Sequence, residues 1–227
     1  MHRLIKLFSL LLISMSVYWI YQKTMNSYYQ ITSIGDQYSI GITSYGIIEY
    51  SYIDYIQEEI QKKKDKVETN KTYNQKDQSI KNILLIFQTP NIKKTLYDTN
   101  LLVLSLGYND VITSLSIEEN NTNQIMEEIE NNYNQLIKEI RKYYHKDIVV
   151  LGYIEDDRYD SNQQIGIKQL NKILKKNKEV IYIDTNQLLK ERNKYFSNPK
   201  NHFPNSKGYK RIAMKIIQKT LENKENI

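Results

Sequence analysis

The sequence contains no cysteine and only three histidines, and both shortages narrow the kinds of site it can form. Without cysteine the chain makes no disulfide and no thiolate metal site, and it has no residue on which a lipoprotein anchor could be built. His2 lies near the N-terminus, and His145 lies at the expected exposed end of a helix. His202 is therefore the only candidate for a catalytic base.

A strong charge excess is also missing. The formal net charge is +6, but residues 1–29 hold three basic side chains and no acidic one, which leaves 29 basic and 26 acidic side chains in the remainder. So small an excess argues against nucleic acid as a partner. The lysine runs at 62–64 and 175–176 are interpreted as solvated helix faces.

The pattern of ligating residues predicts no metal and no cofactor. Asp156, Asp157 and Asp160 form an acidic patch, but no histidine lies near them in the sequence, and their spacing differs from that of a calcium-binding loop. We interpret this patch as a solvated turn.

An apolar run, LIKLFSLLLISMSVYWI, covers residues 4–20, with Arg3 and Lys6 at its start. Basic residues before such a run indicate an N-terminus on the cytoplasmic side of a membrane. Aromatic residues at 18, 19 and 21 suit a membrane interface, which favours an uncleaved signal anchor. Cleavage after Ser14-Met15-Ser16 and a buried core helix are the alternatives. Either export route places the domain outside the cytoplasm, on the membrane or secreted.

From residue 29 onward, short apolar runs alternate with longer stretches of helical periodicity. Strands are predicted at 30–34, 67–73, 101–106, 148–153 and 180–183. Helices are predicted at 47–64, 77–87, 123–144 and 165–174 (after a capping box at Ser161-x-x-Gln164), and a last one is capped by Asn205 or Ser206. The alternation predicts a three-layer α/β/α domain with a mainly parallel, doubly wound sheet over residues 29–227, preceded by a hydrophobic helix within residues 1–28.

Small and polar residues gather next to three of these elements. Gly35-Asp36-Gln37 follows the first strand, Gly107-Tyr108-Asn109-Asp110 follows the third, and residues 198–205 precede the last helix. In parallel sheets, ligands bind beyond the carboxyl ends of the strands, so we expect these segments to meet in one site. Ordinary turn formation is the alternative explanation for each segment taken alone.

In this order, the same segments resemble the sequence blocks of the SGNH (GDSL-type) hydrolase family. SIGDQYSIG at 33–41 is similar to the nucleophile block, LSLGYNDV at 104–111 to the Gly-x-Asn-Asp block, and NHFPNSKGYKRIA at 201–213 to the histidine block. TSYGIIEYSYIDYI at 43–56 resembles an exported bacterial branch. The resemblance covers roughly residues 30–220 and implies the flavodoxin-like fold of that family.

The resemblance also places the family's catalytic positions on this chain. Gln37 stands at the nucleophilic serine position. Phe203 stands at the histidine position, with His202 one residue earlier, and the acidic position falls on Lys200 or Asn201. A carboxamide cannot act as the alkoxide nucleophile of an acyl transfer.

Other positions match the family. Gly107 and Asn109 match the block whose asparagine amide stabilises the oxyanion, whereas no glycine of the second family block is evident in residues 70–80. Residues expected to line the ligand cleft are Gly35, Asp36, Ser39, Asp110 and Phe203.

These departures lead to three hypotheses of different classes, and whether the chain is an enzyme stays open between them. The first is a non-catalytic member that binds a cell-wall glycan or lipid ligand, and the combined substitutions favour it. The second is an active esterase or deacetylase in which Ser39 or an activated water replaces the serine, with His202 as base. The third is a membrane-held interaction protein. The sequence leaves the oligomeric state undefined.

Overall fold

In the computed structural model of the protein, the described residues are 12–19, 28–43, 45–64, 66–117, 121–156, 159–197 and 202–221. Residues 12–19 form a helix whose large apolar side chains are exposed. The rest of the predicted signal segment lies outside the described residues. Within the described ranges, no helix combines the length and the apolar character that a membrane crossing requires.

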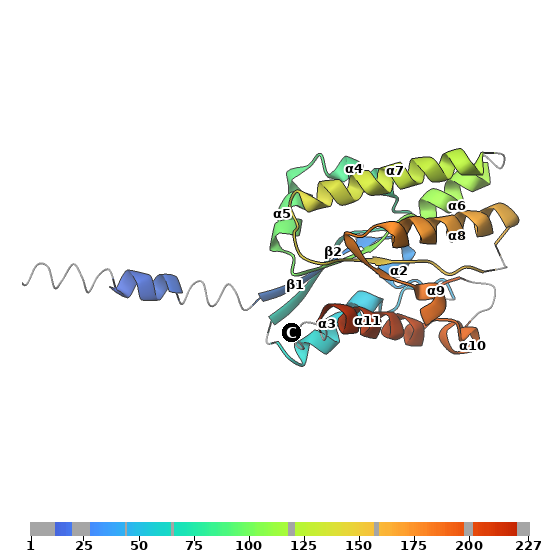
Figure 1. The fold of residues 1–227 in the computed structure, drawn as a ribbon. Helices are drawn as coiled ribbons and strands as arrows, with labels where there is room; N and C mark the ends of the chain where they lie inside the picture. The colour runs from blue at the N-terminus through green and yellow to red at the C-terminus, as the bar shows by residue number, and fades with distance from the viewer. Residues whose placement is uncertain are drawn as a thin grey trace, which may run out of the picture.

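The described residues contain one sheet of parallel strands in the order β2-β1-β3-β4-β5 (Figure 1). The strands are β1 (Tyr28–Gly35), β2 (Lys66–Asn74), β3 (Leu101–Ser105), β4 (Ile148–Leu151) and β5 (Val180–Ile183). This order defines a flavodoxin-like doubly wound fold, whose switch point lies between β1 and β3. The predicted α/β/α fold is confirmed.

Helices cover both faces of the sheet (Figure 1). One layer consists of α3 (Tyr52–Gln61) and α11 (Ser206–Thr220), which pack against each other. The opposite layer contains α4 (Ile80–Ile86), α5 (Pro90–Asp98), α6 (Tyr108–Ile117), α7 (Thr122–Arg141) and α8 (Ser161–Lys176). Three short helices lie in connecting segments: α2 (Gln37–Ile40), α9 (Thr185–Leu188) and α10 (Arg192–Tyr195).

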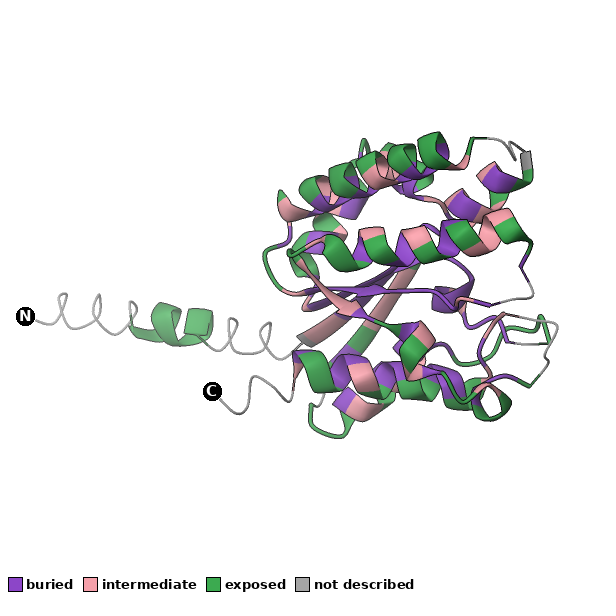
Figure 2. Cartoon of the chain, turned by 45° about the vertical axis from the view of Figure 1, so that its right-hand side comes forward, coloured by how far each residue is buried: buried purple, intermediate pink, exposed green. Residues whose placement is uncertain are grey.

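The core follows from this layering. Every residue of β3 and β4 is buried, because both faces of these central strands are covered by helices (Figure 2). The edge strand β2 is only partly buried and carries Lys66, Glu68 and Lys71. Charged side chains on an edge strand oppose pairing with a strand of another molecule.

Two predicted helix starts need correction. The helix expected from residue 47 begins only at Tyr52, because Ser51 and Asp54 form a capping box that ends the extended chain there. α8 is capped by Asp160, whose carboxylate accepts the Gln163 amide at 2.8 Å, and the predicted box at Ser161 is wrong. Asn205 caps α11, as predicted.

Two of the longer helices, α5 and α6, are absent from the prediction, as are the short helices α2, α9 and α10. α6 begins inside the segment interpreted as a polar loop, because Gly107, with a φ of 111°, reverses the chain directly after β3. Tyr108 and Asn109 therefore lie in a helical turn, which sets the direction of both side chains.

Gly35 of β1 lies directly opposite Ser105 of β3, and we expect it to tolerate no side chain. A Cβ on Gly35 would lie 2.1 Å from the Ser105 Oγ and 2.7 Å from the Ser105 carbonyl oxygen. Gly35→Ala should therefore lower the free energy of unfolding by about 3 kcal/mol, as measured by urea denaturation. Gly46→Ala is the control, since Gly46 has a φ of 75° and no neighbour within 4 Å, and should cost only about 1 kcal/mol. Equal losses in the two variants would contradict this account.

Candidate functional site

The turn after β1 is held in place by β3. The Asp36 amide donates to the Ser105 carbonyl at 2.9 Å, across the strand pair in which Gly35 lies opposite Ser105. The Asp36 carboxylate accepts the Tyr38 amide at 3.1 Å and so caps α2. Gln37 is thereby fixed as the first residue of this short helix, at the carboxyl end of β1.

Gln37 and Asn109 form a closed pair of carboxamides. Gln37 Nε2 donates to Asn109 Oδ1 at 2.9 Å, and Asn109 Nδ2 donates back to Gln37 Oε1 at 3.2 Å. Gln37 is only 6% exposed. The structure therefore joins the two predicted site residues, one from each side of the β1–β3 switch point.

The loop after β2 occupies the remaining hydrogen-bonding capacity of Asn109. Its Nδ2 also lies 3.0 Å from the carbonyl oxygens of Lys76 and Gln78. A carboxamide nitrogen carries two hydrogens, and three acceptors (Gln37 Oε1 and the carbonyl oxygens of Lys76 and Gln78) share both of them. The amide that would stabilise an oxyanion in an active relative is here bound to acceptors of its own chain.

Asp36 sits in a buried polar cluster behind this pair. The Tyr153 hydroxyl, from the segment after β4, donates to Asp36 Oδ2 at 2.5 Å. The Tyr52 hydroxyl lies 3.2 Å from the hydroxyls of both Ser33 and Ser105. Burial raises the pKa of Asp36 to about 7, while hydrogen bonds from the Tyr153 hydroxyl and the Tyr38 amide act in the opposite direction.

Ser39 is also buried and Asp110 is half-buried, and both side chains are bonded to the backbone of the protein. The Ser39 hydroxyl is fully buried and donates to the Asp36 carbonyl at 2.6 Å, so its proton is held by the backbone of its own helix. The Asp110 carboxylate accepts the Ile80 amide at 3.0 Å, and burial raises the pKa of Asp110 to about 6. This geometry leaves the hydrolase hypothesis without an accessible serine at the turn.

His202 and Phe203 are adjacent residues of the last loop, and their rings pack against different tyrosines. Phe203 packs edge-on against Tyr38 and Tyr108, with ring centroids 6.0 Å away in each case. The His202 ring stacks on Tyr159 at 3.7 Å. Phe203, at the family's histidine position, is thus the residue that contacts the helices carrying Gln37 and Asn109.

Asp156 is the site residue that sequence reasoning misplaced. The structure sets its Oδ2 3.9 Å from His202 Nδ1 and leaves Asp156 only 9% exposed, so the predicted solvated turn is wrong at this residue. Its position directly after β4, at the ligand-binding edge of the sheet, was the available signal. The predicted acidic positions, Lys200 and Asn201, lie outside the described residues.

Packed aromatic rings fill the space between the last loop and the turn after β1. Tyr38 contacts Tyr153 with a centroid separation of 5.3 Å and Tyr209 with one of 6.3 Å, and Tyr108 contacts Tyr153 with one of 5.5 Å. All four tyrosines are buried. Among the described residues, histidine and acidic side chains nowhere gather in a group of three that could hold a metal ion.

A parallel sheet of order 2-1-3-4-5 with its polar site at the β1–β3 switch point defines the class of the protein as a flavodoxin-like α/β/α fold. Residues 31–216 match the model of the GDSL-like lipase/acylhydrolase family, and the chain belongs to that family. The resemblance found in the sequence blocks is thereby confirmed.

Solved structures share this fold. The lipase Lip_vut3 from a goat rumen metagenome superimposes with a TM-score of 0.69 at 20% identity, over 84% of this chain and 96% of the lipase. A catalytic serine mutant of Axe2, an acetylxylan esterase from Geobacillus stearothermophilus, gives 0.62 at 16% identity, over 84% and 93% of the two chains. No curated protein matches the sequence.

The raised pKa of Asp36 predicts a pH effect on stability. A carboxyl whose pKa is 3.8 in the unfolded chain and about 7 in the fold stabilises the fold most when it is protonated, and that contribution is lost as the pH rises through 7. Between about pH 4 and about pH 8, the free energy of unfolding of the wild type should therefore fall by on the order of 3 kcal/mol relative to that of Asp36→Asn, as measured by urea denaturation. Asp77→Asn, at an exposed position of the neighbouring loop, is the control. Parallel pH profiles for wild type and Asp36→Asn would contradict the assignment.

Proposed function

We propose that this chain is a non-catalytic member of the GDSL-like family that binds a cell-envelope ligand without hydrolysing it. The observation that carries the proposal is the carboxamide ring between Gln37 and Asn109, which occupies both the nucleophile position and the oxyanion amide. Loss of a single oxyanion donor alone costs roughly 10²–10³ in rate.

The last loop supports the same conclusion. Acyl transfer by a serine requires an imidazole that accepts its proton and a carboxylate that orients the imidazole. His202 Nδ1 and Asp156 Oδ2 lie 3.9 Å apart, but the residue at the family's histidine position, which contacts Tyr38 in the turn after β1, is Phe203. Because residue 37 is a glutamine, His202 and Asp156 have no serine hydroxyl at that position to activate.

The surface beside the site suits ligand binding. The segment after α2 exposes Tyr45, Ile47, Ile48 and Tyr50, each more than half accessible to solvent. A backbone bond from Glu49 N to Gly41 O at 2.9 Å holds this segment against the end of α2. Clustered exposed apolar side chains on a monomer mark an interaction site.

We assign an acylated glycan as the ligand class. One solved relative is an acetylxylan esterase, and tyrosine rings offer the flat, amphipathic surface on which a sugar ring can stack. The N-terminal apolar run supports a position on the outer side of a membrane, where such polymers lie. The same exposed segment would also serve a protein partner, and a pull-down with the full chain separates the two cases.

Ester hydrolysis tests the loss of catalysis. We expect the full-length protein in detergent to hydrolyse p-nitrophenyl acetate no faster than buffer, and a fluorophosphonate probe to label no serine, because no accessible hydroxyl lies at the turn. Turnover that Asn109→Ala abolishes would overturn the proposal.

Engineered variants provide the matched control. Gln37→Ser alone should stay inactive, because Phe203 still occupies the histidine position. Gln37→Ser with Phe203→His frees the Asn109 amide and supplies a base, so this double variant should accept the fluorophosphonate label and thereby validate the assay.

Ligand binding is tested separately by calorimetry with acetylated xylo-oligosaccharides. Tyr45→Ala combined with Tyr50→Ala should weaken binding at least about tenfold through the loss of two stacking surfaces. Tyr97→Ala removes a still more exposed tyrosine from the far end of the domain and should leave binding unchanged. Equal binding by both variants would exclude this segment as the ligand surface.

One observation favours a second candidate, a residual hydrolase. The proximity of His202 and Asp156 would suit activation of a water molecule. That hypothesis requires acyl-ester turnover which His202→Ala removes while Ser39→Ala leaves it intact.

A further inference from the structure

The two ends of the sheet carry opposite charge. Four connections lead from a helix into β2, β3, β4 and β5, and we call their described residues (61–64, 66, 98–101, 141–148 and 176–180) the amino-end face. These residues include nine basic and three acidic side chains. The described connections that leave the carboxyl ends of the strands (35–37, 74–80, 105–108, 151–156, 159–161 and 183–185) include one basic and six acidic side chains.

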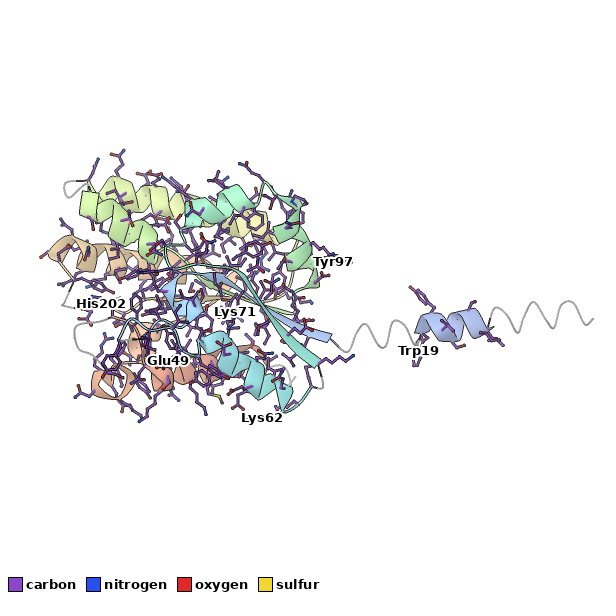
Figure 3. All side chains as sticks on the ribbon, turned by 180° about the vertical axis from the view of Figure 1, so that it is seen from behind. Trp19, Glu49, Lys62, Lys71, Tyr97 and His202 are labelled. Carbon is purple, nitrogen blue, oxygen red and sulfur yellow. The ribbon has the colours of Figure 1, made fainter. Side chains whose placement is uncertain are left out.

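Topology brings together lysine runs that are far apart in the sequence. All five strands are parallel, so their amino ends lie at one end of the domain. The run at 62–64 and the lysines at 176 and 178 therefore belong to one surface, and each of them is exposed. Figure 3 shows Lys62 and Tyr97 toward this end of the domain and His202 at the opposite end.

Helix stabilisation explains only part of this charge. Arg141 and Lys176 are the last residues of α7 and α8, where a cation interacts favourably with the helix dipole. Lys64, Lys66 and Lys178 lie outside any helix and do not serve that purpose.

Local ion pairs do not remove the excess either. Lys62, Lys142 and Lys176 pair with Glu59, Glu139 and Glu130 at 2.6–3.0 Å. With these three glutamates added, the face still has nine basic against six acidic side chains. Exposed pairs of this kind contribute little and exchange readily with other anions.

The position of the N-terminal segment identifies the partner. β1 begins at Tyr28, at the amino-end face, and only eight residues lie between it and Trp19, the last described residue of the apolar helix. A chain of that length spans at most about 32 Å, so a bilayer that holds the apolar helix lies close to this face. Tyr97, 82% exposed in the last turn of α5, adds an interfacial aromatic side chain to the same end.

We infer that the amino-end face rests on the anionic headgroups of a phospholipid bilayer and so directs the Gln37–Asn109 site away from the membrane. Lysines near an anionic bilayer are attracted over about a Debye length, roughly 10 Å, and salt weakens that attraction. The inference rests on the proposed membrane anchoring. It does not depend on whether the site is catalytic.

The absence of native cysteine makes the orientation measurable in the full chain. His145→Cys places a fluorophore on the amino-end face, and Ile48→Cys places one at the opposite end, on the exposed apolar segment. The labelled proteins are reconstituted in vesicles of phosphatidylcholine, with or without phosphatidylglycerol, that contain a headgroup-quenching lipid. We expect at least twofold stronger quenching at position 145 in the anionic vesicles, weakened by high salt, and none at position 48.

Charge reversal tests the role of the lysines while the anchor stays in place. Lys64→Glu, Lys66→Glu and Lys178→Glu together should abolish quenching at position 145. The matched control reverses three exposed lysines elsewhere, Lys168→Glu, Lys190→Glu and Lys210→Glu, and should retain it.

Five results would overturn the inference. Quenching at position 48 in place of 145 would mean that the apolar segment enters the membrane. Equal quenching in neutral and anionic vesicles would mean that the contact is not electrostatic. A fluorescence response at 145 to a soluble anionic polysaccharide, with none to vesicles, would identify a polymer partner. If the protein does not float with vesicles of either composition, the proposed membrane anchoring on which the inference rests is refuted. That result differs from protein that floats but shows no quenching at position 145, which would refute only the role of the amino-end face.

Discussion

The close approach of β1 and β3 at Gly35 and Ser105 is the constraint on which the site depends. A hydrogen atom in place of a side chain at Gly35 lets the Ser105 carbonyl accept the Asp36 amide, and this bond turns the chain into α2. Gln37 and Asn109 then leave adjacent strands at the switch point of the sheet, where their carboxamides meet. The site is therefore a consequence of strand pairing, because both of its carboxamides follow directly from neighbouring central strands.

Within this geometry, the carboxamides of Gln37 and Asn109 are bonded to each other, which is the basis of the proposed loss of catalysis. The frame of the family is present in the Gly35–Asp36 turn, the Gly107 turn and the capped start of α11. Within that frame, the polar groups that would face a substrate are satisfied by one another, and the space toward the last loop contains tyrosine and phenylalanine rings. Conservation of a fold and conservation of a reaction are separate matters, since the frame is stabilised by packing and the reaction by a few exposed groups.

Much of the fold was predictable, and particular residues show why. The runs LLVLS and IVVL identify central parallel strands because strands buried between two helix layers are almost entirely apolar, and the predicted strand at 180–183 coincides with β5. α6 escaped prediction because its first turn, Tyr108-Asn109-Asp110, has the composition of a loop. The pairing of Asp156 with His202 also escaped, because local composition suggests a solvated turn and only tertiary packing buries the carboxylate. The contact between Gln37 and Asn109 spans 72 positions, and no local pattern reports its hydrogen bonds.

The carboxamide ring has a consequence for the history of the chain. If the proposed loss of catalysis is correct, a lineage with Gln37 at the nucleophile position and Phe203 at the imidazole position needs two changes before acyl transfer returns, and we expect neither change alone to restore activity. The ring also couples its two positions, because an acid at either residue would set a carboxylate against the carbonyl oxygen of the other. Positions 37 and 109 should therefore vary together among descendants, and under the proposed loss of catalysis that mutual fit would oppose a return to activity.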